Sequence, residues 1–515
     1  MNAMSDVSAG TARAITRRLP GPVDLLSLYA QLSDGGRRPE TALFETTAGK
    51  SIILERAAVR VECRDGEVVV SALSANGQSV FDLVQRALVR HVECSTPGEV
   101  RFRYERSTQV DSGRRLLDAS PFDVLRTIST GLRSETPEEA MTVCLIGIIA
   151  FDHVDLFEDL PANAEDPTDF PDFVFWLAES AVVAEPRRTP RLICASFGSG
   201  DEESDRRHHF SAVERLRDLA HRASDVRAVR PSPGTPVDVS EDISDAEFAA
   251  SVAHLKGHIL AGDVYQIVAS RTFSAPCPDP LSAFARVRAL DRSPYMFFVS
   301  MRDSVLFGAS PETSVRVTQE NGRPILEVKP IAGTRPRGMD EDQDNRMEAD
   351  LRLDEKEAAE HMMLVDLARN DVARVSEPGT RHVSHLMSLE KYARVMHLVS
   401  SVKGMLAPAY DALHALQTCL NVGTLSGAPK LKATELLRRY ERTRRGPYGG
   451  AIGWLNAEGQ LDTGVVIRSA LVKNGTAYVR AGAGVVYDSD PVAEADETRR
   501  KASAVLTAIA GEQVR

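Results

Sequence analysis

The chain has 515 residues, of which 43% are hydrophobic and 26% charged, a composition typical of a soluble globular protein with one large domain or two. Its formal net charge of −11, with no lysine- and arginine-rich block, argues against nucleic acid as a partner. The six cysteines stand singly, which predicts neither a zinc site nor a disulfide framework. No apolar run is long enough to cross a membrane, and no signal-type segment follows the N-terminal arginines, so we expect a cytoplasmic protein.

The N-terminal half is predicted to be rich in β-structure. Residues 1–20 are expected to be loosely ordered. Alternating or continuous apolar stretches predict strands at residues 51–55, 59–64, 67–73, 143–151 and 173–184, and helical spacing predicts helices at residues 81–92 and 205–222. A proline-rich stretch at residues 226–242 marks the expected end of this region, which we place at residues 21–240.

The C-terminal half, residues 244–505 with a tail at 506–515, alternates strands and helices. A capping-box pattern at Ser244 and Glu247 begins a helix at residues 245–261. We expect a loop at residues 330–334, a solvated mobile segment at 339–354, and a three-stranded meander at 448–455, 461–472 and 476–486. Asp490 and Pro491 begin a final helix. Meanders separated by helices indicate a mixed α+β protein rather than a doubly wound one.

Two pairs of glutamates are the most informative feature of this half. Glu357 and Glu360 lie three residues apart in a helix whose apolar face is expected at positions 358, 362, 365, 368 and 372. Glu494 and Glu497 repeat that spacing near the end of the chain. One such pair is typical of a solvated helix face, but two pairs in separate helices favour a hard-cation site, since Mg²⁺ binds carboxylate oxygens.

Other residues suggest an anionic ligand. Arg468 interrupts an apolar strand, where its guanidinium needs a partner such as a carboxylate. The stretch at 481–485, AGAGV, allows a close backbone approach to an anion, although a tight strand exit would explain the same glycines. His397 lies in an apolar stretch and is either a core residue or a catalyst. No nucleotide-binding fingerprint occurs, and no cysteine has the flanking glycines of a glutaminase nucleophile.

Taken together, these stretches resemble the chorismate-utilising enzymes, and among them the large, ammonia-using subunits of anthranilate synthases. The resemblance rests on GDVYQIVASR (262–271), SPYMFF (293–298), FGASPE (307–312), PIAGTRPRG (330–338), EHMMLVDLARND (360–371), VMHLVS (395–400), GTLSGAPK (423–430), RRGPYGGAIGW (444–454), DTGVVIRSA (462–470), AGAGVV (481–486) and EADETRRKA (494–502). It is dense from residue 245 to 505 and thinner before residue 240, where FDHVDLFEDLP (151–161) still fits.

The resemblance implies a fold and a set of site residues. The fold is two large antiparallel β-sheets packed together with helices outside. Mg²⁺ would be held by Glu360 and Glu497, with Glu357 and Glu494 close by. The residues implied for the substrate chorismate are Gly333, Thr334, Tyr448, Arg468, Gly482, Ala483 and Gly484, with His397 and Thr424 beside its ring.

Two positions distinguish branches of the family. Enzymes that make isochorismate or salicylate carry a water-activating lysine where this chain has Gln266, and aminodeoxychorismate synthases carry a lysine where it has Ala332. With neither lysine, the resemblance implies that ammonia, received from a separate glutamine amidotransferase subunit, attacks chorismate to give anthranilate and pyruvate. Two alternatives stay open: an enzyme that stops at 2-amino-2-deoxyisochorismate in a secondary pathway, and a non-catalytic relative that binds an aromatic acid.

A regulatory site is also implied. In the family, tryptophan binds between an N-terminal Leu-Leu-Glu-Ser-type strand and a Pro-Tyr-Met segment, away from the active site. Here Pro294, Tyr295 and Met296 are present, but Thr46 stands at the serine position. We therefore expect a tryptophan site within the N-terminal region, with weaker inhibition, because threonine adds a methyl group.

Overall fold

The computed structural model describes residues 9–234, 236–290, 292–392 and 395–511. Its strands in the first 240 residues are β1 (Thr11–Arg18), β2 (Thr41–Thr46), β3 (Ser51–Arg64), β4 (Glu67–Ala72), β5 (Val92–Thr96), β6 (Glu99–Arg103), β7 (Arg133–Ser134), β8 (Cys144–Ile149), β9 (Phe173–Ala184) and β10 (Arg191–Phe197). Those that follow are β11 (Ser240–Glu241), β12 (Gln266–Pro276), β13 (Tyr295–Ser300), β14 (Ser304–Ser310), β15 (Thr313–Glu320), β16 (Arg323–Val328), β17 (Ile331–Pro336), β18 (His382–Lys391), β19 (Val395–Met405), β20 (Gly427–Ala428), β21 (Ala451–Asn456), β22 (Leu461–Val465), β23 (Ser469–Lys473) and β24 (Thr476–Val485).

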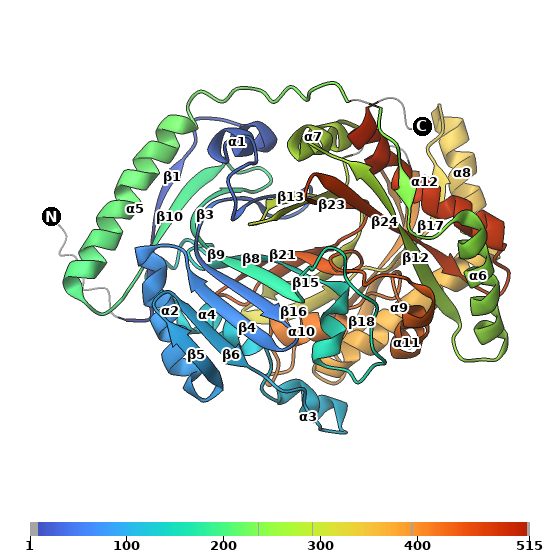
Figure 1. Cartoon of the computed structure of the whole chain (residues 1–515), viewed down its shortest axis with the longest axis horizontal. Helices are drawn as coiled ribbons and strands as arrows, with labels where there is room; N and C mark the ends of the chain where they lie inside the picture. Colours follow the sequence, from blue (N-terminus) through green and yellow to red (C-terminus); the bar gives the residue numbers. More distant parts are fainter. Residues whose placement is uncertain (1–8, 235, 291, 393–394, 512–515) are drawn as a thin grey trace.

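The helices lie on the outside of these strands (Figure 1). They are α1 (Leu25–Leu32), α2 (Ala75–Ala87), α3 (Ser112–Leu117), α4 (Phe122–Gly131), α5 (Glu202–Arg222), α6 (Asp245–Leu260), α7 (Pro280–Leu290), α8 (Glu341–Leu353), α9 (Glu355–Val375), α10 (Ala412–Cys419), α11 (Lys430–Tyr440) and α12 (Pro491–Ala510), with short 3₁₀ turns at Val89–His91 and Phe151–Leu156. No helix of the described ranges is long and apolar enough to span a membrane.

Two antiparallel runs of strands share the long strands β3 and β9. The N-terminal part of β3 continues through β2, β13, β14, β23 and β24 to β12. The N-terminal part of β9 continues through β8, β21, β22, β15 and β16 to β19. The register of β3 on β9 shifts between Leu54 and Val59, where the pair passes from one run to the other.

The two runs pack face to face, as expected. Strands and short connections alone supply the buried cluster between them, which contains Phe44, Trp176, Tyr295, Phe297 and Trp454. The outer faces are covered by helices: α2, α4, α9 and α10 on one side, and α1, α5, α7 and α12 on the other. The mixed α+β class with large antiparallel sheets is therefore confirmed, although the shared strands join the two sheets into one hydrogen-bonded network.

Several elements form where local sequence signals place them. β9 is buried along almost its whole length on both faces, which explains its continuous apolar run. The Ser244 and Glu247 capping box begins α6, and Asp490 caps α12 with Pro491 in the first turn. These caps satisfy backbone N–H groups at the helix start, so they act without any tertiary partner.

Other predictions were wrong. Residues 11–18 are not loosely ordered but form β1, which pairs with β10. The predicted strands 51–55 and 59–64 are one strand, and the helix predicted at 81–92 begins at Ala75, where Ser74 caps it. In each case a partner or cap outside the predicted window extends the element.

Around the later motifs the errors have the same origin. The expected loop at 330–334 lies in β17, paired with β19, and the expected mobile segment at 339–354 contains α8, capped by Asp340. The expected meander is two hairpins, β21–β22 and β23–β24, because the chain leaves the ladder between Val465 and Ser469. The expected tail at 506–515 begins inside α12, and its last four residues lie outside the described ranges.

Candidate active site

Helix α9 presents the first glutamate pair. Asp354 caps the helix, and Arg335 lies 2.7 Å from the Asp354 carboxylate and 3.4 Å from Glu357. Glu360 accepts a 2.9 Å hydrogen bond from Nε2 of Gln266 on β12. Burial raises the pKa of Glu360, and the neighbouring Glu357 raises it further. The carboxyl groups of Glu357 and Glu360 thus lie close together near the start of β12.

The buried face of α9 differs from the predicted one by a small rotation. Met362, expected to be buried, is 39% exposed, whereas His361 and Leu364 are buried. Asp371 lies about three turns beyond Glu360 on the same face of α9, where it pairs with Lys430. The His361 ring contacts the hydroxyl of Ser400 on β19 at 2.6 Å, which anchors the helix to the sheet.

Helix α12 presents the second pair. Burial raises the pKa of Glu494, and the charge of Glu497 adds to that effect. Lys501, one turn further on, lies 2.7 Å from Glu497, and its charge lowers the pKa of both Glu494 and Glu360. A Cβ at Gly484, on the strand that leads into α12, would lie 3.8 Å from Glu360 Oε1, so we expect the two glutamate pairs to border a common space.

The residues around this space fit a hard cation held jointly with a ligand. No group of three or more His, Cys, Asp or Glu side chains in the described ranges is arranged to hold a metal by itself. However, Glu494 Oε2 and Gln266 Oε1 are buried and have no hydrogen-bond partner among the described residues. Mg²⁺ commonly takes only one or two carboxylates and completes its shell with water and substrate oxygens.

His397 lies against the strand that carries the Gly-Thr pair. Its Nδ1 is 3.0 Å from the carbonyl oxygen of Gly333 and 3.1 Å from Oγ1 of Thr334. Because a carbonyl only accepts, Nδ1 carries the proton, and Nε2 is left as the basic nitrogen. Gly333 has a φ of +73°, and a Cβ there would lie 2.9 Å from Leu351 and 3.4 Å from Glu357. The glycine therefore lets this strand approach the first glutamate pair.

Thr424 donates a 2.6 Å hydrogen bond to Oε1 of Glu312. Burial raises the pKa of Glu312 to about 7, although Thr424, Lys501 and Arg468 lower it in part. Glu312 can therefore hold a proton at neutral pH.

Tyr448 and the Gly482–Gly484 backbone lie side by side. A Cβ at Gly482 would lie 2.9 Å from the Tyr448 hydroxyl, and one at Gly484 would lie 2.9 Å from Gln266 Nε2. Lys501 donates to the Gly482 carbonyl at 3.0 Å. Ala483, between the glycines, is fully buried. Any side chain at either glycine would collide with a candidate site residue, which explains the repeat Gly-Ala-Gly.

Arg468 is not in a strand. It lies in the break between β22 and β23 with a φ of +46°, and its carbonyl accepts from Ala309 at 3.1 Å. Its charge lowers the pKa of the buried Glu312 carboxyl. The left-handed backbone conformation thus takes Arg468 out of the β-ladder.

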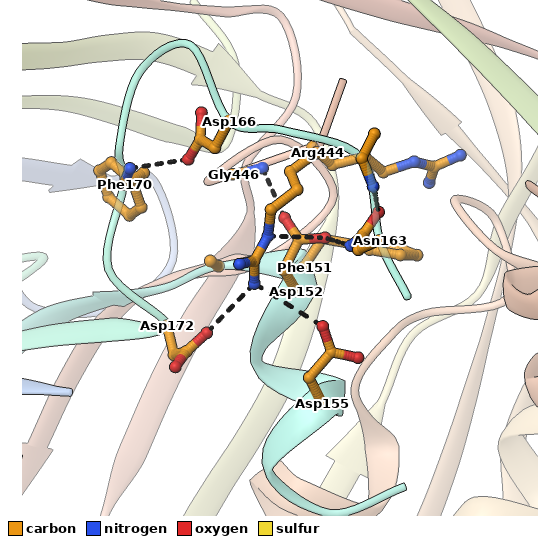
Figure 2. Close-up of polar contacts among 12 residues, drawn as sticks. Phe151, Asp152, Asp155, Asn163, Asp166, Phe170, Asp172, Arg444 and Gly446 are labelled. Carbon is orange, nitrogen blue, oxygen red and sulfur yellow. Dashed lines mark hydrogen bonds and ion pairs between the residues drawn. The ribbon is translucent and has the colours of Figure 1, made fainter. Parts of the chain in front are cut away.

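The segment at 151–156 supports the loop that carries Tyr448. Figure 2 shows Asp152 accepting from the Gly446 N–H at 2.7 Å and from Asn163 at 2.7 Å. Arg444 lies between Asp152, Asp155 and Asp172 at distances of 3.5–3.9 Å. The loop is thus fixed from the N-terminal half of the chain.

The predicted regulatory residues meet at the junction of the two halves. Thr46 on β2 pairs with Tyr295 on β13, and Thr47 N–H donates to the Pro294 carbonyl at 3.1 Å. Met296, next on β13, is buried. A Cβ at Gly49 would lie 3.3 Å from the Thr46 methyl carbon, so that methyl faces the β2–β3 turn.

Comparison with known proteins decides the family, because the model of the chorismate binding enzymes matches residues 89–507. The chain belongs to the chorismate-binding enzyme family. It is 45% identical over 476 residues to anthranilate synthase component 1 of Vibrio cholerae, covering 89% of this chain and 88% of that protein. It is 44% identical over 476 residues to the pyocyanine-specific anthranilate synthase component 1 of Pseudomonas aeruginosa, covering 90% and 87%.

A solved structure in this chorismate-binding family has the same fold. It is anthranilate synthase component I from Streptococcus pneumoniae, with a TM-score of 0.66 and 30% identity, covering 90% of this chain and 93% of that one. The recognition of the family from sequence motifs is therefore confirmed, and the protein is an enzyme of this family.

Two residues of this chorismate-binding enzyme were not predicted as site residues. Glu312 ends the FGASPE stretch, and Lys501 lies in the EADETRRKA stretch, so both were inside quoted motifs. The signal for Lys501 was its i,i+4 spacing from Glu497. Glu312 had no such signal, since only burial beneath Thr424 distinguishes it from a surface glutamate.

Proposed function

We propose that the protein converts chorismate and ammonia into anthranilate, pyruvate and water, with Mg²⁺ as cofactor. The hydrogen bond from Gln266 to Glu360 is the observation that carries this proposal. An amide at this position cannot act as a base, so the site has no group there to activate water. Ammonia needs no such activation when it arrives neutral, because its lone pair is already free.

The first step replaces a hydroxyl group by ammonia. Nitrogen forms a bond to ring carbon 2, the double bonds shift, and the hydroxyl on carbon 4 leaves as water after gaining a proton. Glu312, protonated near neutral pH and bonded to Thr424, is the group suited to donate that proton. The product of this step is 2-amino-2-deoxyisochorismate.

The second step releases pyruvate. The ring loses the proton on carbon 2, the bond to the enolpyruvyl oxygen breaks, and the ring becomes aromatic. His397 is the proposed proton acceptor, since Nδ1 faces the Gly333 carbonyl and Nε2 is the basic nitrogen. The pyruvate enolate leaves with the electron pair and is protonated.

The substrate is a dianion, and the proposed site supplies cations for it. Arg468 offers a planar fork for one carboxylate, and the Gly482–Gly484 backbone beside Tyr448 allows a close approach. When bound at Glu360 and Glu497, Mg²⁺ would supply positive charge that bridges the acidic helices to the other carboxylate. Lys501 would orient Glu497 for that role.

We further propose that ammonia comes from a separate glutamine amidotransferase subunit. Glutamine hydrolysis of that kind requires an accessible thiolate, but Cys63, Cys144, Cys194, Cys277 and Cys419 are buried, and burial raises the pKa of each thiol. The sixth, Cys94, is exposed on β5 among exposed neighbours and has no flanking glycines. A tryptophan site between β2 and β13 is proposed as the means of feedback control.

Product analysis tests the proposal. The purified chain, incubated with chorismate, ammonium and Mg²⁺, should form fluorescent anthranilate and equimolar pyruvate, identified by mass spectrometry. Accumulation of 2-amino-2-deoxyisochorismate without pyruvate would establish the alternative activity, and no chorismate consumption would establish a binding protein.

A further inference from the structure

Arg445 is a buried guanidinium directly behind the candidate active site. Only 5% of the residue is exposed. Two of its nitrogens donate to the Glu441 carboxylate at 2.9 and 2.6 Å, and it also donates to the carbonyl oxygens of Val268 at 2.6 Å and Leu425 at 2.5 Å. The guanidinium of Arg445 thus donates hydrogen bonds to two different stretches of backbone and to one carboxylate.

Each backbone contact lies next to a proposed site residue. Val268 is two residues from Gln266 on β12, and Leu425 directly follows Thr424. The guanidinium also lies over an aromatic ring on its own loop, with Cζ 5.9 Å from the ring centroid of Tyr448. One planar group therefore links β12, the stretch that follows Thr424 and the loop that carries Tyr448.

The charge balance keeps Arg445 in place. Glu441 also pairs with Arg480 at 2.9 Å and accepts from the Ser270 N–H at 2.9 Å. Burial raises the pKa of Glu441, but the two guanidinium groups outweigh that effect and lower it. The carboxylate therefore stays ionised, and the surrounding bonds hold the arginine in a single orientation.

We propose that Arg445 is a positioning residue of the active site. It fixes the relative positions of Gln266, Thr424 and Tyr448 that the reaction requires. This inference rests on the proposed function. It assigns no contact with substrate to Arg445, which acts through the three segments that it joins. Displacements of about 1 Å in a reacting group cost about 100-fold in rate, so the effect should fall on kcat.

Lysine cannot replace this arginine. An ammonium has a similar charge but no planar fork, so it cannot bond both carbonyls and the carboxylate at once. Arg445→Lys therefore tests geometry at constant charge. Arg445→Ala tests rescue, because a cavity lined by Arg445, Tyr448 and Arg480 gives a small guanidinium access to the vacated position.

The experiment compares both variants with the parent and with Arg442→Ala, whose side chain is 56% exposed and pairs with Glu247. Steady-state kinetics with chorismate and ammonium give kcat and KM, and thermal unfolding reports folding. We expect kcat to fall about 100-fold in Arg445→Lys and Arg445→Ala while the chorismate KM changes less than about threefold. Ethylguanidinium should restore part of kcat to Arg445→Ala alone, and Arg442→Ala should match the parent.

The results separate this inference from the proposed function. A parent enzyme that forms no anthranilate refutes the proposed function. An active parent with Arg445→Lys at full kcat refutes the positioning role. Loss of kcat in Arg445→Ala that ethylguanidinium does not restore, or that merely follows the loss of folded protein, also refutes it. If Arg445→Ala fails to fold, the kcat of folded Arg445→Lys tests the positioning role by itself. A kcat about 100-fold below that of the parent supports the role, and a full kcat refutes it.

Discussion

Gln266 Nε2 donates a 2.9 Å hydrogen bond to Glu360 Oε1, which joins β12 to α9 at the proposed metal site. A single contact thus connects the position that distinguishes family branches with a carboxylate proposed for Mg²⁺. Because the amide satisfies one carboxylate oxygen, the other stays available for a cation. The relationship links the choice of nucleophile to the geometry of the proposed cofactor site.

The metal prediction concerns Glu360 and Glu497. Activity should require Mg²⁺, and Glu360→Gln or Glu497→Gln should lower kcat/KM at least ~100-fold, because each removes a charge that the cation needs. Steady-state rates with Mg²⁺ and with EDTA measure this effect. Glu355→Gln, an exposed neighbour on the same helix, is the control. Full activity in EDTA would exclude the metal assignment.

The nucleophile prediction concerns the nitrogen source. The isolated chain should use ammonium salts, with rates at any one pH that follow the NH₃ concentration, and should not use glutamine. Addition of a glutamine amidotransferase subunit should confer glutamine use. Anthranilate production from glutamine by the chain alone would contradict the proposal that a separate subunit hydrolyses glutamine.

Glu312 should impose its own pH dependence. Its raised pKa of about 7 means that the carboxyl is protonated below pH 7 and loses the proton as pH rises through 7. At constant NH₃ concentration, kcat should therefore decline above about pH 7, and Glu312→Gln should lose about 100-fold or more in kcat together with this decline. Glu320→Gln, exposed on the adjoining strand β15, is the control. An unchanged profile in Glu312→Gln would show that another group donates the proton.

His397→Met should uncouple the two steps. Amination needs only positioned ammonia and an acid, whereas elimination of pyruvate needs a base, so 2-amino-2-deoxyisochorismate should accumulate. Mass spectrometry of the products over time detects it. His385→Met, exposed on the neighbouring β18, should behave as the parent. Anthranilate formed at the normal rate would identify His397 as a core residue.

Thr46→Ser should tighten tryptophan inhibition. The threonine methyl faces Gly49 beside the β2–β13 junction, and an extra methyl in a packed site costs about 1–3 kcal/mol. Inhibition should therefore strengthen roughly 5- to 150-fold, with little change in turnover without tryptophan. Inhibition curves for Thr46→Ser, the parent and the exposed control Thr47→Ser test this. Overlapping curves would show that the methyl is accommodated.

Much of the site could be predicted from local sequence. Glu357–Glu360 and Glu494–Glu497 are spaced by helix geometry, and their helices begin at caps visible in the chain, at Asp354 and Asp490. Such signals depend on residues within one helical turn, so they predict the helix start regardless of which segment the helix packs against. The same is true of strand β9, whose continuous apolar run demands burial on both faces.

Contacts between distant residues were decided only by the tertiary structure. The pKa of Glu312 depends on burial beneath Thr424, 112 residues away, and no local pattern marks it. Arg468 leaves its strand because β22 and β23 pair with different partners, β15 and β14. Strand β1 forms because the distant strands β10 and β7 supply its hydrogen bonds. Local sequence determines caps and periodicity, whereas β-pairing and burial depend on segments that meet only in the folded chain.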